Sequence, residues 1–167
     1  ALEALGPLHS ALFGNVETPE KTDSPSHTHD GPTASTFAVL DAARVLHLEG
    51  LLQGSGLKHK CLFKGNALED MGDAAPWLVK LDANNKFTRN LFTAGDTPGY
   101  LWGREPGIFI RSHASFDELY SHFRKYIMIM DEADRMYYMR FWEPKWLIDI
   151  ISIMTDQQTS KFMRNTQ

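Results

Sequence analysis

The sequence predicts an α/β domain in which a mixed β-sheet, containing a parallel βαβ crossover and an antiparallel hairpin, carries helices packed on its faces. Two observations lead to this fold class. Residues 36–64 contain an apolar strand pattern, a helical pattern and a second strand pattern, which is the order of a βαβ unit. Further along, two apolar runs flank the charged residues 131–134, as expected for an antiparallel hairpin.

Length and composition narrow the classes of function. The chain has 167 residues, 43% of them hydrophobic, which suits one globular domain with a sizeable core. A net charge of −4 gives no basic field for nucleic acid. No apolar run approaches the ~20 residues that span a bilayer, and no leader pattern opens the chain. We therefore expect a cytoplasmic protein without nucleic-acid or membrane partners.

The chain divides into three parts. Residues 1–14 are predicted to form an N-terminal amphipathic helix, and residues 15–36 a polar linker with three prolines and no aromatic residue. Residues 37–167 would form the folded α/β domain. The linker contains His27, His29 and Asp30, but their flexible setting, without a thiolate or a fixed helical spacing, favours a linker over a metal site.

The first half of the domain supplies most of the predicted sheet. A buried strand at 36–41 ends at Asp41, a helix covers 45–53, and a second strand at 58–64 should run parallel to the first. A third strand at 77–81, a helix at 86–94, a Gly/Pro-rich loop at 95–107 and a strand at 107–111 follow.

The second half begins with a helix whose start is signalled by Ser115 and Glu118, spaced as a capping box. One face of this helix should be buried and the other, which includes His122, wet. The hairpin, at 126–130 and 135–142, is apolar on both faces, so both should be covered, with its second strand ending at Glu143. Pro144 suits the first turn of the next helix, whose apolar stripe includes Trp146, Leu147, Ile150, Ile151 and Met154, and a second capping box opens a last helix at 155–164.

Six short segments in order carry a resemblance to a known family. They are Leu40-Asp41-Ala42-Ala43-Arg44, Cys61-Leu62-Phe63-Lys64-Gly65, Ala75-Pro76-Trp77-Leu78-Val79-Lys80-Leu81-Asp82, Gly107-Ile108-Phe109-Ile110-Arg111-Ser112, His122-Phe123-Arg124-Lys125 and Arg140-Phe141-Trp142-Glu143-Pro144. Together they cover roughly residues 37–162 and resemble the type VI secretion adaptors, also called effector chaperones (Tap or TEC proteins). The chain departs from that pattern at Glu143, where the family more often has Asp, and by an insertion at 104–106.

The resemblance implies a non-catalytic adaptor that binds a cognate toxic effector and helps load it onto the VgrG spike. Its partners would be the secreted effector and VgrG, and it would need no cofactor or metal. The resemblance also marks motif residues whose role is expected to be structural, namely Asp41, Arg44, Arg111, Arg124, Arg140, Glu143 and Pro144.

The candidate chemistry of individual residues leaves two other classes open. Asp41 ends a strand, where ligands of open α/β sheets bind, so a hydrolase using Asp41 and a histidine is one alternative. A local ion pair between Asp41 and Arg44 is favoured over that role, and Arg140 would need an acid such as Asp41, Asp82 or Glu143. Cys61 alternates as a buried strand residue, which indicates a structural thiol. A small-molecule or metal-binding sensor is the other alternative.

The partner-binding surface is predicted from large side chains near loops and the hairpin. Trp102 lies in a Gly/Pro-rich loop, where an aromatic residue suits an interface anchor or folds back over the sheet edge. The methionines at 128, 130, 136 and 139 either fill the core or form an adaptable surface. The predicted partner-binding residues are Tyr100, Trp102, Arg104, Tyr138 and Trp142.

Overall fold

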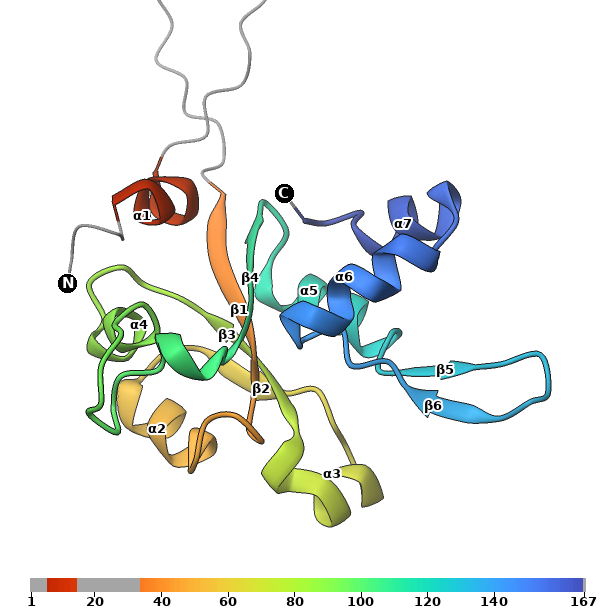
Figure 1. Cartoon of the computed structure of the whole chain (residues 1–167), viewed down its shortest axis with the longest axis horizontal. Helices are drawn as coiled ribbons and strands as arrows, with labels where there is room; N and C mark the ends of the chain where they lie inside the picture. The colour runs from red at the N-terminus through yellow and green to blue at the C-terminus, as the bar shows by residue number, and fades with distance from the viewer. Residues whose placement is uncertain (1–5, 15–33, 167) are drawn as a thin grey trace, which may run out of the picture.

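The computed structural model describes residues 6–14 and 34–166 of the chain (Figure 1). A central β-sheet has α2 and α4 on one side and α5, α6 and α7 on the other, and a narrow two-stranded hairpin extends from the body. The α-helices are α1 (Gly6–Phe13), α2 (Leu48–Ser55), α3 (Asn66–Met71), α4 (Lys86–Leu91), α5 (Phe116–Arg124), α6 (Pro144–Ile153) and α7 (Asp156–Phe162), with 3-10 turns η2 (Gly72–Ala74) and η3 (Trp102–Arg104).

The central sheet contains four strands in the order β2-β3-β1-β4. Its middle strand, β1 (Ser35–Asp41), is apolar over most of its length, and every residue after the first is buried. Such a run suits a strand covered by helices on both faces. The other three strands are β2 (His59–Cys61), β3 (Pro76–Lys80) and β4 (Gly107–Ser112).

The predicted mixed sheet with a parallel pair is not confirmed, because every pair of neighbouring strands in the described sheet is antiparallel. The strands β1 and β2 do run in the same direction, since each is antiparallel to β3. They do not pair, because β3 and β4 occupy the two edges of β1. The combination of sheet and helices is confirmed, but the order of the strands depends on long-range pairing that the βαβ pattern does not contain.

Gly107 permits the close contact between β4 and β1. Its φ of +154° is unfavourable for other residues, and a Cβ atom placed there would lie 2.0 Å from the carbonyl oxygen of Val39. A side chain at this position would collide with the backbone of the central strand. The glycine therefore allows the start of β4 to pair with Leu40 at the end of β1.

The helix α1 packs on the domain that follows it. Leu12 joins the buried core, and the Thr36 hydroxyl donates a hydrogen bond to its carbonyl oxygen. The buried Arg111 donates to the carbonyl oxygens of Ala11 (3.1 Å) and Gly14 (2.9 Å) at the end of the helix. A guanidinium is favourable at this negative end of a helix. The predictions for residues 1–5 and 15–33, including His27, His29 and Asp30, lie outside the described residues.

Both predicted capping boxes are confirmed, at Ser115 and Glu118 and at Thr155 and Gln158. The prediction that His122 faces solvent is wrong. Its ring is buried against Tyr126, and its Nε2 lies 2.7 Å from the Phe162 carbonyl oxygen, so that it connects α5 to α7. The error arose because α7 covers the edge of the helix face that was expected to be wet.

The hairpin is confirmed as antiparallel, with strands β5 (Met128–Met130) and β6 (Met136–Tyr138). Its expected burial is wrong, since all six strand residues are exposed and the hairpin extends away from the sheet (Figure 1). The second strand also ends at Tyr138 rather than at Glu143. Only the base of the hairpin is anchored: Ile127 and Met139 are buried, and the Met139 N–H donates to the Ile127 carbonyl oxygen (3.0 Å).

Several other boundaries shift by a few residues. The helix α2 begins at Leu48 rather than at 45, and β2 contains three residues rather than the seven predicted at 58–64. The start of α6 at Pro144 is confirmed. Within the described part of the chain, no helix combines the length and apolar character needed to cross a bilayer.

Candidate functional site

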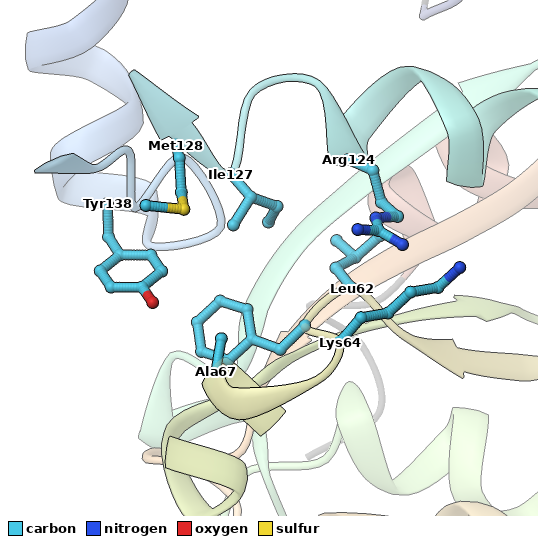
Figure 2. A pocket seen from close by; sticks show the side chains of 8 residues that line it. Leu62, Lys64, Ala67, Arg124, Ile127, Met128 and Tyr138 are labelled. Atoms are coloured by element: carbon cyan, nitrogen blue, oxygen red, sulfur yellow. The ribbon is translucent and has the colours of Figure 1, made fainter. Parts of the chain in front are cut away.

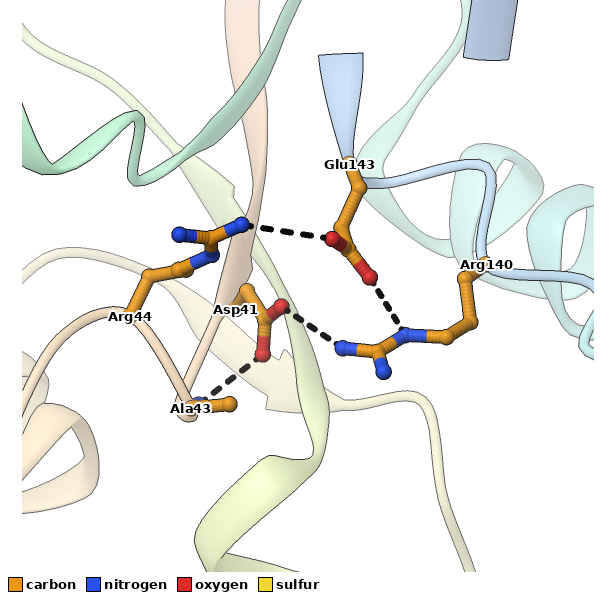
Figure 3. A network of polar contacts seen from close by, with 5 residues as sticks. All are labelled: Asp41, Ala43, Arg44, Arg140 and Glu143. Atoms are coloured by element: carbon orange, nitrogen blue, oxygen red, sulfur yellow. Dashed lines mark hydrogen bonds and ion pairs between the residues drawn. The ribbon is translucent and has the colours of Figure 1, made fainter. Parts of the chain in front are cut away.

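A network of charged side chains lies at the carboxyl end of β1 (Figure 3). The Arg140 guanidinium lies 3.3 Å from Asp41 Oδ2 and 2.5 Å from Glu143 Oε1, and Arg44 Nη2 lies 3.5 Å from Glu143 Oε2. The second oxygen of Asp41 accepts the Ala43 N–H at 2.9 Å. Two carboxylates and two guanidiniums therefore balance one another between the sheet and the segment that opens α6.

The local sequence explains this arrangement. Phe141 and Trp142 are buried, and the Phe141 ring stacks on Phe123 with a centroid distance of 5.3 Å. With these two aromatic residues in the core, the flanking Arg140 and Glu143 turn toward the end of β1 (Figure 3). Pro144 then begins α6, where its missing N–H costs little. The five-residue motif thus joins the core, the charged network and a helix start.

The geometry favours a structural role for this network. The Asp41 side chain is 1% exposed and its two oxygens are held by Arg140 and the Ala43 N–H. The predicted Asp41–Arg44 ion pair is replaced by one between Arg44 and Glu143. Of the three acids suggested for Arg140, Asp41 and Glu143 are partners, while Asp82 instead accepts the N–H of Asn84. The sheet is antiparallel, so the parallel-sheet argument for a ligand at Asp41 no longer applies.

The hairpin and α6 together present most of the exposed large apolar side chains. Fifteen such side chains are exposed in the described part of the chain, and ten of them lie between residues 128 and 163. We call β5, β6 and α6 the apolar arm. Its exposed members are Met128, Ile129, Met130, Met136, Tyr137, Tyr138, Trp146, Ile148 and Ile153.

The helix α6 is apolar on both of its faces. Three residues pack against the core, as predicted: Leu147 and Ile150 of the helix, and Met154 directly after it. Trp146 was predicted to belong to the same stripe, but its side chain is exposed, and so is Ile153 at 83% exposure. A helix that is apolar all round is normally covered on all sides. Residues 146–154 are almost all apolar, so the hydrophobic pattern of the sequence could not distinguish the buried face of α6 from its exposed face.

The loop around Trp102 forms a second surface feature. The Trp102 ring contacts Phe92 at a centroid distance of 6.0 Å and remains 43% exposed. The loop is attached to α4 and its C-terminal end, since the N–H groups of Leu101 and Trp102 donate to the carbonyl oxygens of Asn90 and Thr93. Trp102 therefore packs on the end of α4 with one part of its ring and exposes the other part to solvent.

The five residues predicted to bind a partner do not form one patch. Tyr100, Trp102 and Arg104 are exposed near α4, whereas Tyr138 is exposed on the hairpin at the other end of the molecule (Figure 1). Trp142 requires correction, since it is 1% exposed and lies in the core. Its alternation with Tyr138 was inferred from a strand that ends before it. Of the other motif residues, Arg111 is buried beside α1 and Arg124 is half-buried at the end of α5.

The single thiol is buried, as predicted. Burial raises the pKa of Cys61 from 9.0 to about 11, which keeps it in the weakly nucleophilic protonated form. Among the described residues, no group of three or more His, Cys, Asp or Glu side chains is placed to hold a metal ion.

Comparison with known protein families gives one match. The family model described as Domain of unknown function (DUF4123) matches residues 36–161, about three quarters of the chain. No curated protein and no solved structure matches the chain. The matched range includes the sheet, the charged network and the apolar arm.

Proposed function

The chain belongs to the DUF4123 family, and from this premise we propose that it is an adaptor of a bacterial type VI secretion system. In this role it binds a cognate toxic effector in the cytoplasm and helps load the effector onto the VgrG spike. The adaptor itself catalyses no reaction. The family match supports the proposal because this domain occurs in effector adaptors of that system.

The observation that carries the proposal is the apolar arm. Its nine large apolar side chains are exposed on elements that follow one another in the chain, and apolar groups gathered on a surface commonly mark sites of protein association. Methionine and tyrosine are enriched at interface cores, and methionine adapts its shape to a partner at small cost. The exposed strands β5 and β6 contain both residue types.

An adaptor of this kind acts through binding equilibria. By covering apolar effector surface, it stabilises whichever effector conformation it binds, in proportion to its concentration relative to the dissociation constant. Both oxygens of the Asp41 carboxylate are already bonded, one to Arg140 and the other to the Ala43 N–H. This supports a role without acid–base chemistry, since a general base must reach the proton that it removes.

The test is an affinity capture from the bacterium that encodes the chain, with wild type and two variants as bait. We expect wild type to recover one toxin-like protein together with VgrG. The exposed Met136 of the arm is changed in Met136→Asp and Trp102 in Trp102→Ala, and each variant should recover less effector at a nearly unchanged melting temperature. Folded wild-type bait that recovers neither protein would overturn the adaptor proposal.

A further inference from the structure

A small pocket opens at the base of the hairpin (Figure 2). Its volume is about 160 Å³, and it lies between the segment after β2, the start of α3, the end of α5 and the first residue pair of the hairpin. That pair, Met128 and Tyr138, faces Lys64 and Arg124 across the pocket, with Ile127 between them. The pocket is therefore lined mainly by apolar side chains, and Arg124 and Lys64 border it opposite Tyr138, with the Lys64 ammonium pointing outward (Figure 2).

The size of the pocket limits what it can accommodate. Binding sites for small molecules usually enclose about 300–1,000 Å³. An apolar cavity of about 150 Å³, in contrast, accommodates a single benzene ring. At about 160 Å³ this pocket matches one aromatic or branched aliphatic side chain.

The cationic side of the pocket lacks compensating charge. Lys60, Lys64 and Arg124 surround one aromatic ring, that of Tyr120, at 4.3, 5.7 and 5.9 Å from its centroid. In the part of the chain that the structure describes, none of the three forms an ion pair with a carboxylate. The chain as a whole has a net charge of −4, so this local excess of positive charge is opposite in sign to the charge of the whole chain. A carboxylate is the group that would complement it.

Building on the adaptor function proposed above, we propose that the pocket anchors an acidic segment of the effector that carries one apolar side chain beside a carboxylate. The apolar side chain packs against Ile127 and Met128, beside the rings of Phe63 and Tyr138, whose centroids lie 5.3 Å apart. The carboxylate meets Arg124 and, at the edge of the pocket, Lys64. A protein segment fits better than a free metabolite because the pocket is continuous with the exposed surface of the hairpin. A chain leaving the pocket passes directly onto the apolar arm.

The first experiment tests the chemistry of the pocket with a defined probe. N-acetylphenylalanine has a ring and a carboxylate, and its amide, N-acetylphenylalaninamide, has the ring without the charge. In ¹H–¹⁵N NMR titrations of the full chain, we expect the acid to shift the amide signals of Lys64, Arg124 and Ile127, with a dissociation constant on the order of 1 mM. The amide should bind more weakly, and absence of shifts at these residues would overturn the proposal.

The second experiment uses the purified effector recovered by wild type. Ala67→Leu fills the pocket from α3, and Lys64→Gln/Arg124→Gln removes its charge. Each should weaken effector binding about tenfold at low salt, a loss typical of two exposed ion pairs or one anchor. The matched control, Lys161→Gln/Arg164→Gln, removes two exposed cations at the end of α7 and should bind normally. Thermal melts verify that every variant is folded.

The outcomes separate the two proposals. Wild type that captures the effector, with both pocket variants binding equally well, would overturn the pocket as an anchor and leave the adaptor function in place. Shifts with N-acetylphenylalanine but normal effector binding by both variants would identify a small carboxylate as the occupant instead, which also overturns it. Wild type that binds no effector would overturn the adaptor function and, with it, the assigned occupant.

Discussion

The strand β1 and the hairpin strands β5 and β6 have similar apolar sequences and opposite environments. In β1, Val39 pairs on both sides, with Leu78 of β3 and Ile108 of β4, and is fully buried. In the hairpin, Met130 pairs only with Met136 and is 61% exposed. The two regions differ in their neighbours rather than in composition. An apolar run therefore predicts a strand, while the surrounding chain determines whether it is buried.

The largest effect on stability is expected at the junction of β1 and β4. Gly107→Ala places a Cβ atom 2.0 Å from the Val39 carbonyl oxygen at a positive φ. We expect the free energy of unfolding to fall by about 4 kcal/mol, because backbone strain adds to overpacking. Urea denaturation measures the loss. In Gly54→Ala of α2 the added Cβ atom would meet no atom within 4 Å apart from the helix's own backbone and the adjacent residues, so stability should stay unchanged or rise by about 0.5 kcal/mol.

Two methionines test the contrast between the core and the arm directly. Met139→Ala removes a buried side chain at the base of the hairpin and should cost about 3 kcal/mol. Met136→Ala makes the same change on the exposed strand β6 and should stay within about 0.5 kcal/mol. If chemical denaturation gave equal losses of stability for the two variants, Met136 would be packed in solution as Met139 is, and the contrast between the core and the arm would not hold.

The charged network at the end of β1 should contribute less to the free energy of unfolding than the buried apolar side chains. Arg140→Ala leaves the buried Asp41 carboxylate without its cation, which would cost several kcal/mol if the pair were fully enclosed. Because the Arg140 side chain is 45% exposed, solvent screening reduces the expected loss to about 2 kcal/mol. Arg135→Ala breaks the exposed pair with Asp131 at the hairpin tip and should barely move the denaturation midpoint. A similar midpoint shift in both variants would contradict the structural role of the network.

The smallest effect concerns Cys61. With its pKa raised to about 11 by burial, only about 0.1% of the thiol is ionised at pH 8, so iodoacetamide should label the folded chain slowly and the unfolded chain rapidly. The unfolded thiol, with its ordinary pKa of 9.0, loses its proton first as pH rises, so the contribution of Cys61 to stability falls between that pH and about 11. Cys61→Ala should remove that part of the pH dependence. Fast labelling under native conditions would contradict the buried setting.

Local signals in the sequence predicted local structure well. Ser115 with Glu118, and Thr155 with Gln158, identified two helix starts because capping depends on residues three positions apart. The need of Arg140 for an acid was also predicted, although Asp82 could not be distinguished from Asp41 and Glu143 without the fold.

Long-range pairing set the limit of prediction. The strand β3 lies between β1 and β2, and this position depends on contacts between strands far apart in the chain. The hydrophobic pattern of residues 36–64 cannot predict such contacts. The burial of His122 and the exposure of Trp146 likewise depend on where α7 and α6 pack. The pocket was missed for the same reason, because its cations come from residues 64 and 124, on separate elements.

The buried base of the hairpin has a consequence for binding kinetics. Ile127 and Met139 hold both ends of the hairpin in the core, joined by a backbone hydrogen bond of 3.0 Å. The direction in which the hairpin extends is therefore set before any partner arrives, although its side chains remain free to change rotamer. A partner would lose little entropy in orienting the hairpin and would mainly order the methionine side chains of β5 and β6. Such preorganisation should make association fast and leave differences among partners to their dissociation rates.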